Sequence, residues 1–467
     1  MTKFLSVLYS FLWGLPVLLL ILGVGIHYSL LSDFAQLRMF PLAMRRFLSK
    51  LVRREKSAEG ISSFQALCAA LAATVGTGNL VGVAGAICIG GPGAVFWMWV
   101  CGIIGMMTKF AEVTLAVHYR VKKDGACMGG PMYMICAGLD KRWHWLAKLY
   151  ALFGVVAAFG VGNATQINAL IGGINGVFGY ETSRRNLAIG LILAVLIGAM
   201  LFGGIKRIGA TAEKLVPVIS VAYIALCIGV LASNVRLIPN AICAIVQGAF
   251  SPRSVTGGVV CSVLCTLRTG CSRGVFTNEA GMGTASIAHA SANTSHPIEQ
   301  GLMGIMEVFL DTILICTLTA LAILTSGVAI PYGTDVGGAL TTAAFSTVYG
   351  NWSRIFLAAA LCCFAFATVL GWGIYGARCA QFLFGQKAWE VFALIQAVAV
   401  IPGAVMPTRT IWLMAEIFNG LMAIPNLIAL AVLSPVFFRL MIDYKRNSGI
   451  LNANGGYYAD FHQRKPL

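Results

Sequence analysis

Charged residues are scarce in this chain of 467 residues. Asp, Glu, Lys and Arg make up 11% of it and hydrophobic residues 58%, whereas a soluble protein carries roughly 25% charged residues. Such a chain cannot cover its apolar surface with polar groups in water, which excludes a soluble enzyme, a disordered chain and a secreted disulfide module. The composition therefore predicts an all-α protein that crosses a membrane several times.

The chain also lacks the Cys and His spacings of a zinc site, although it contains 14 cysteines. Most stand alone in apolar runs, as Cys101 and Cys243 do, and we interpret them as small core-facing or lipid-facing residues. The sequence contains no HExxH, GxSxG or DxD-like pattern at an interface, so a membrane enzyme is not favoured. We expect no cofactor beyond a coupling ion.

Long apolar runs set the topology, because about 20 apolar residues cross a bilayer as a helix. We predict eleven spans, at 9–31, 61–90, 93–118, 148–178, 186–204, 209–231, 256–287, 298–327, 354–379, 388–407 and 410–437. The run 236–250 is too short to span and is predicted to lie at the interface.

The basic residues give an orientation to these spans. The segment 36–60 holds seven Lys and Arg, and placing it in the cytoplasm puts 23 of the 33 basic residues inside and seven outside. This predicts an N-terminus outside and a C-terminus inside, and it explains the net charge of +16 without nucleic-acid binding. The segment 36–60 is either a basic helix on anionic lipid headgroups or a plain connector.

Two spans contain interruptions that a lipid-facing helix would not tolerate. The first lies at 72–82, where Gly76 and Gly78 flank Thr77 and leave backbone groups that protein, water or a ligand must satisfy. The second lies at 268–283, with several glycines and three ionisable groups. Each opens a block of five spans, the layout of inverted-repeat transporters. Two close-packing GxxxG sites are the structural alternative.

Several longer motifs resemble the alanine or glycine:cation symporter family, the sodium-coupled small amino-acid carriers of bacteria and archaea. They are Val75-Gly-Thr-Gly-Asn79, Gly90-Gly-Pro-Gly-Ala-Val-Phe-Trp-Met-Trp99, Gly129-Gly-Pro-Met-Tyr133, Phe276-Thr-Asn-Glu-Ala-Gly-Met-Gly283, Gly371-Trp-Gly-Ile-Tyr-Gly376 and Asn419-Gly-Leu-Met-Ala-Ile-Pro-Asn426. The resemblance implies a LeuT-type fold with an extra helix, in a bacterial or archaeal plasma membrane. The chain would then divide into an extra helix (1–35), a basic interfacial helix (36–60), two five-helix repeats (61–235 and 236–440) and a cytoplasmic tail (441–467).

The resemblance also implies a central site for a small amino acid. The residues it places there are Thr77, Gly78, Asn79, Gln166, Phe276, Thr368 and Trp372. Backbone N–H groups of the first interruption would receive the substrate carboxylate, and carbonyls of the second would receive the ammonium. By analogy with the fold, a sodium ion would be held by oxygens of Ala72, Val75, Phe364, Ala367 and Thr368.

This chain departs from the family pattern in ways that affect the choice of substrate. Gly373 and Ile374 replace a more usual small polar residue and tyrosine, Glu416 stands for an aspartate, and Thr277 stands for a common serine. Trp372 would fill much of the pocket, so we expect glycine and alanine to fit and leucine or phenylalanine not to fit.

Buried ionisable groups need partners in a membrane. We expect Lys109 to pair with Glu112 three residues away, and Glu307 with Asp311 to hold a cation or to join Arg268 or Arg273. Glu279 would accept backbone N–H bonds at the second interruption. We predict that His289 lies at the interface, near the cytoplasmic end of its span.

The function expected from these patterns is sodium-coupled symport of alanine or glycine by alternating access, with no enzymatic activity. A proton-coupled carrier that uses Glu307 or Asp311 is an alternative, as are glutamine, serine or D-alanine as substrates. An ion channel is a more remote alternative, because channels usually show a repeated filter or a ring of identical subunits. The oligomeric state is left open.

Overall fold

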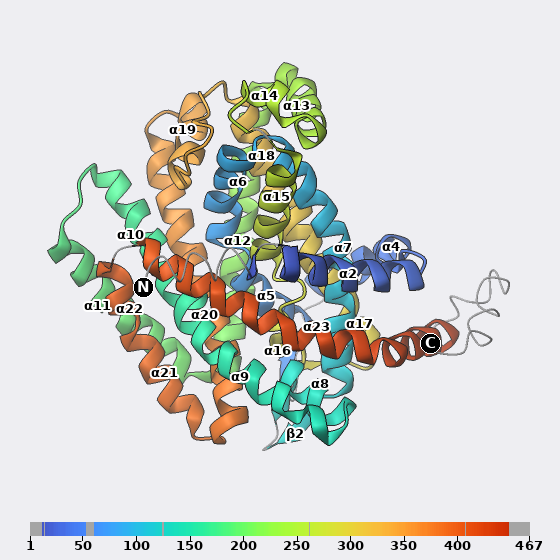
Figure 1. Ribbon diagram of the computed structural model, residues 1–467. Coiled ribbons are helices and arrows are strands. Elements are labelled where there is room, and N and C mark those ends of the chain that lie inside the picture. The colour runs from blue at the N-terminus through green and yellow to red at the C-terminus, as the bar shows by residue number, and fades with distance from the viewer. Residues whose placement is uncertain are drawn as a thin grey trace.

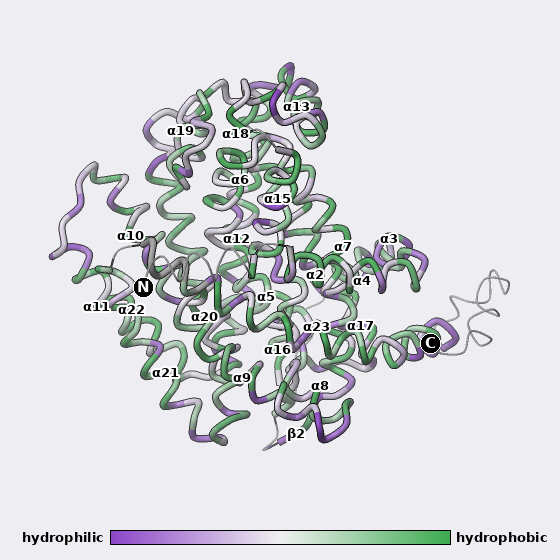
Figure 2. The backbone as a smooth tube through the Cα atoms, in the orientation of Figure 1, coloured by the Kyte–Doolittle hydropathy of each residue, from purple (hydrophilic) through white to green (hydrophobic). Residues whose placement is uncertain are grey.

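The computed structural model describes residues 12–13, 15–52, 60–123, 126–260, 262–406 and 408–447, and most of them lie in helices (Figure 1). Residues 53–59 of the basic segment and the tail from 448 onward lie outside the described residues. In Figure 2 hydrophobic residues run along the helices, as expected for helices that face lipid or one another.

The first half of the chain contains the helices α2 (Leu15–Leu31), α3 (Ala35–Arg38), α4 (Phe40–Val52), α5 (Ser63–Thr74), η1 (Gly78–Gly82), α6 (Val83–Gly90), α7 (Gly93–His118), α8 (Pro131–Gly138), η2 (Lys141–Trp143), α9 (His144–Phe159), η3 (Gly160–Ala164), α10 (Thr165–Phe178), α11 (Ser183–Phe202) and α12 (Gly204–Ser233). Two of its short strands, β2 (Val121–Lys123) and β3 (Ala126–Met128), pair antiparallel.

The second half contains η4 (Val235–Leu237), α13 (Ile238–Phe250), α14 (Pro252–Thr256), α15 (Val263–Asn278), α16 (Thr284–His289), α17 (Pro297–Val308), η5 (Phe309–Cys316), α18 (Thr317–Thr325), α19 (Gly338–Tyr349), α20 (Trp352–Phe384), α21 (Ala388–Val398), α22 (Val400–Val405) and α23 (Thr408–Asn447). The strand β1 (Ile61–Ser62) precedes α5 and pairs in parallel with β4 (Ala292–Asn293), which follows α16.

The apolar helices agree with the predicted spans in position more closely than in number. Among the described residues, eight helices are long and apolar enough to cross a membrane, and the bent pair α5 and η1–α6 makes nine. The helix α2 has 17 residues and α15 has 16, so these two predicted spans are shorter than that criterion. The helix α13 is short, as predicted for the run 236–250.

The first break, residues 75–77, lies where the sequence predicts it. The two helical parts on either side of it meet at an angle of 47°. Val75 adopts an extended conformation after α5, and the chain resumes as the π-helix η1 at Gly78. Two further π-helical segments, η3 and η5, interrupt other spans. Such segments mark functional sites in many helices.

The second break, residues 279–283, lies later than the sequence predicts. The helix α15 runs without interruption to Asn278, so the expectation of unwound chain from Arg268 was wrong for its first part. The glycines there serve packing instead, because a Cβ at Gly270 would lie 2.3 Å from the Ala94 carbonyl oxygen of α7. Left-handed backbone at Glu279, Gly281 and Gly283 makes the actual break.

Candidate functional site

The two breaks face each other across a small cavity. A Cβ at Gly78 would lie 2.7 Å from Cγ2 of Thr277, so the first break and α15 are in direct contact. The cavity has a volume of about 10 Å³, room for about one water molecule, and its lining includes every predicted substrate residue except Asn79. The lining residues are Ala73, Thr74, Gly76, Thr77, Gly78, Val161, Gln166, Phe276, Glu279, Thr368 and Trp372.

Asn79 lies beside the first break and holds it in shape. Its side-chain oxygen Oδ1 accepts the N–H of Gly76 at 2.9 Å, and its Nδ2 donates to Oδ1 and to the carbonyl of Asp311 at 2.8 and 3.1 Å. The side chain of Asn79 therefore points toward η5, and its contacts stabilise the break.

These bonds redirect the amides that would continue the helix. In a regular helix the N–H of Gly76 would pair with the carbonyl of Ala72, and that of Asn79 with the carbonyl of Val75. Here Gly76 donates to the Asn79 side chain, and the Asn79 N–H donates to the Gly76 carbonyl at 3.3 Å. Two carbonyls named as sodium ligands are thus released from their helical partners.

Thr368 lies against the same break. A Cβ at Gly76 would meet its Oγ1 at 2.7 Å, so only glycine allows this approach. The Thr368 hydroxyl donates to the carbonyl of Phe364 at 3.0 Å, which leaves the lone pairs of its oxygen to face the break. Thr368 of α20 therefore lies against Gly76, the residue that follows Val75 in the first break.

Gln166 closes another wall of the cavity. Its Oε1 accepts the Thr77 hydroxyl at 3.1 Å, and its Nε2 donates to the carbonyl of Val161 at 3.1 Å, within the π-helical segment η3. Phe276 also lines the cavity, one turn before the second break. The site thus combines backbone, amide and hydroxyl groups with two aromatic rings.

Two buried carboxylates, Glu279 and Asp311, lie at the breaks and were not among the residues predicted to bind the amino acid. Glu279 lines the cavity and accepts the indole N–H of Trp372 at 2.9 Å and the hydroxyl of Thr284 at 2.5 Å. Glu279 was expected to accept backbone N–H groups, but its donors are these two side chains. Asp311 accepts Asn79 and the Thr312 hydroxyl. Both carboxylates stand out in the sequence only as acids within apolar runs.

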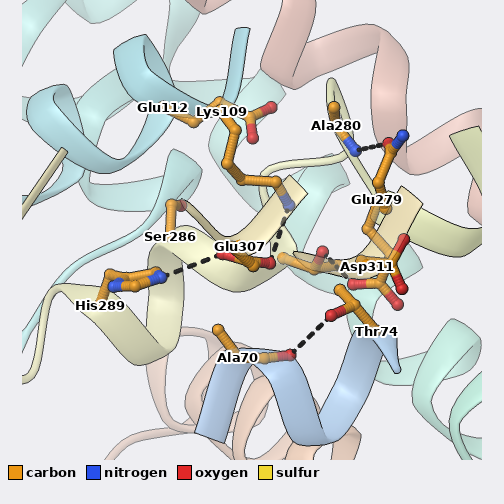
Figure 3. Close-up of polar contacts among 12 residues, drawn as sticks. Ala70, Thr74, Lys109, Glu112, Glu279, Ala280, Ser286, His289, Glu307 and Asp311 are labelled. Carbon is orange, nitrogen blue, oxygen red and sulfur yellow. Dashed lines mark hydrogen bonds and ion pairs between the residues drawn. The ribbon is translucent and has the colours of Figure 1, made fainter. Parts of the chain in front are cut away.

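The remaining buried charges form a network that differs from the expected one (Figure 3). Lys109 pairs with Glu307 at 3.4 Å, and His289 reaches the other oxygen of Glu307 at 3.0 Å. His289 is fully buried, so its predicted interfacial position was wrong. Glu112 accepts the side chain of Asn426 at 2.7 Å instead of pairing with Lys109.

A large vestibule opens on one side of the small cavity. Its volume is about 1430 Å³, and Gly78 and Phe276 line both spaces. Arg273 lies in its wall and pairs with Asp335 at 3.3 Å and with Glu416 at 3.8 Å. The predicted link of Arg273 to Glu307 or Asp311 is replaced by these partners.

The strands β1 and β4 pair away from the residues that line the vestibule, and Ile61, Ser62 and Ala292 in them are buried. They join the start of the first broken span to the end of the second. Arg120 donates to the carbonyl of Ala292 at 2.6 Å, and Ser62 and Gln65 cap α5 reciprocally. The vestibule therefore borders the site on one side, and alternating access requires such a one-sided approach in each of its end states.

Comparison with known proteins agrees with this architecture. The chain is 41% identical to the sodium/alanine symporter AgcS of Methanococcus maripaludis, over 91% of this chain and 93% of that protein. It is 40% identical to the probable sodium/glutamine symporter GlnT of Bacillus subtilis, over 93% of this chain and 89% of that one.

A solved structure shows the same fold. The crystal structure of MhsT in complex with L-phenylalanine matches with a TM-score of 0.56 at 15% identity, over 83% of this chain and 99% of that one. This likeness confirms the predicted LeuT-type fold. The model of the sodium:alanine symporter family matches residues 1–453. The chain therefore belongs to the sodium:alanine symporter family, as its motifs indicate, and is a transmembrane amino-acid symporter.

Proposed function

We propose that this protein couples the uptake of a small neutral amino acid, alanine or glycine, to the entry of sodium. The observation that carries the proposal is the first break, where the N–H groups of Gly76 and Asn79 do not donate to the Ala72 and Val75 carbonyls, and where Gly76 lies against Thr368 and lines the cavity. Carbonyl and hydroxyl oxygens are the ligands that hard cations prefer. Sodium would bind there, with the carbonyls of Phe364 and Ala367 completing the site.

The amino acid would bind in the cavity beside this ion. Backbone N–H groups of Thr77 and Gly78, at the start of η1, would receive its carboxylate, and Gln166 would orient it. Asn79 would contribute by holding the break. The sodium ion would compensate the substrate carboxylate, which makes joint binding favourable in a buried site.

The side chains that line the cavity support a small substrate. Trp372 and Phe276 line it, and both are large and buried. Glutamine is the second candidate, because GlnT is named a probable sodium/glutamine symporter and shares 40% of its residues with this chain. A longer polar side chain would have to extend past Phe276 toward the vestibule.

The proposal includes the predicted topology. The vestibule would face the outside of a bacterial or archaeal plasma membrane, with the N-terminus outside and the C-terminus in the cytoplasm. The basic segment 36–60 would lie on anionic lipid, since the described part of α4 exposes Leu48 and Leu51 beside Arg45.

Uptake into proteoliposomes tests the proposal. Labelled alanine, glycine and glutamine are supplied with an inward sodium gradient, with a proton gradient alone, or with neither. We expect concentrative uptake of alanine or glycine with the sodium gradient only. Uptake driven equally by protons without sodium would contradict the sodium assignment, and preferential uptake of glutamine would contradict the substrate.

A further inference from the structure

Glu279 occupies an unusual position at the second break. It is 2% exposed and has a φ of 53°, in the left-handed region that residues other than glycine and asparagine rarely adopt. The surroundings must therefore hold it there. Its two carboxylate oxygens accept the Thr284 hydroxyl and the indole N–H of Trp372.

The indole of Trp372 makes contacts with three residues, Gly162, Tyr375 and Glu279. Gly162 of η3 leaves room for it, since a Cβ at that position would lie 2.2 Å from the Cβ of Trp372. Tyr375 contacts the indole edge to face, with 5.7 Å between ring centroids. The third contact is the bond from Nε1 to Glu279, at 2.9 Å.

The bond to Glu279 is the polar contact among the three, and it fixes the rotation of the ring. A buried N–H that loses its acceptor is left unsatisfied in apolar surroundings. Glu279 and Trp372 come from different elements, the second break and α20, and both line the small cavity. The orientation of the indole thus depends on a carboxylate at the break.

We propose that Glu279 is a positioning residue for substrate size: its carboxylate holds the Trp372 indole across the cavity and limits the substrate to a hydrogen or methyl side chain. This inference rests on the proposed function. Glu279 acts through Trp372, so an acceptor at this position is required and its negative charge is not.

Binding profiles of purified full-length variants test this inference. Thermal shifts with sodium are measured for glycine, alanine, methionine and leucine, because a ligand that binds the native state raises its melting temperature. We expect the wild type to respond to glycine and alanine only. Glu279→Ala should respond to methionine and leucine as well, and should need about tenfold more alanine. Glu279→Gln keeps an acceptor and should keep the wild-type profile.

A second pair of variants examines the tryptophan side. Trp372→Phe keeps an aromatic ring and removes the N–H, so it should give the profile of Glu279→Ala, and the double variant should add nothing further. The matched control is Trp389→Phe, whose indole N–H donates to the Leu201 carbonyl at 3.0 Å, away from the cavity. The control should keep the wild-type profile.

Several outcomes would overturn the inference. If Glu279→Ala folds and its binding profile is unchanged, the bond between Glu279 and Trp372 does not limit the size of the substrate side chain. If Glu279→Ala does not fold, an unchanged profile in Trp372→Phe would show the same. Loss of alanine binding in Glu279→Gln would show that the charge itself contacts the ligand. A wild type that responds to no small amino acid would overturn the proposed function as well, whereas the other two outcomes leave that function intact.

Discussion

The Asn79 side chain bonds to Gly76 in the first break and to Asp311 of η5, so its loss should lower the stability of the fold. Asn79→Ala removes the acceptor of the Gly76 N–H and the amide donor to the buried Asp311. Leaving such groups unsatisfied costs about 1–3 kcal/mol each. We expect a clearly lower melting temperature in detergent and loss of transport. Asn168→Ala is the control, because its amide makes one exposed bond, and an equal effect of the two variants would refute the role of Asn79.

Thr368 allows a test of the sodium site with little change in shape. Thr368→Val replaces the hydroxyl by a methyl group, so the sodium concentration for half-maximal uptake should rise about tenfold, equivalent to about 1.4 kcal/mol. Thr325→Val is the matched control, since its hydroxyl also donates to the carbonyl four residues earlier, on α18. A sodium dependence that is the same in both variants and in the wild type would remove Thr368 from the site.

The individual residues show where sequence reasoning is sufficient. Thr77 and Gly78 are recognisable because small and polar residues interrupt an apolar run, Trp372 because it belongs to a family motif, and Gln166 because the resemblance places it at the site. The partner of Lys109 was not predictable in this way. Glu112 is near in sequence, but the packing of α17 on α7 brings Glu307 to Lys109 instead, and helix spacing says nothing about a neighbouring helix.

At the scale of elements, the close contact of α15 with α7 should depend on Gly270. A Cβ at this position would lie 2.3 Å from a backbone oxygen, so Gly270→Ala must push the two helices apart. Overpacking of this kind costs about 1–3 kcal/mol. The apparent melting temperature should fall, whereas Gly23→Ala, where a Cβ has no heavy atom within 4 Å, should leave it unchanged. A stable Gly270→Ala protein would contradict this packing.

The same glycines explain why the second break was placed too early. Glycines in an apolar span indicate either unwinding or close helix packing, and the sequence does not separate the two. Gly270 and Gly274 pack against α7, whereas Gly281 and Gly283 adopt positive φ values in the break that follows the helix. The three-dimensional neighbour decides which role a glycine has.

For the whole molecule, the one-sided access predicts a labelling pattern. In a variant with the exposed Cys243 and Cys265 replaced by alanine, Gly176→Cys lies in the vestibule and should react with a membrane-impermeant maleimide on intact cells. Alanine with sodium should slow this reaction. Ala292→Cys, in the strand β4 and fully buried, should stay unlabelled. Reaction of Gly176→Cys in inside-out vesicles alone would contradict the proposed orientation.

The fold of the whole molecule was predictable because apolar length and the family motifs extend over most of the chain. The conformational state of the molecule was not predictable from the sequence. The pairing of β1 with β4 and the width of the cavity depend on how distant segments of the chain pack together. Sequence motifs are the same in every state of a transport cycle.

The narrowness of the central cavity has a consequence for recognition. A cavity of about 10 Å³, with room for about one water molecule, is too small for any amino acid. The lining residues around Thr77 and Trp372 must therefore move apart as a substrate enters. Substrate selection and the conformational change then occur together, because part of the binding free energy is used to widen the cavity. A compound that binds in the widened cavity and prevents it from closing again would therefore inhibit transport.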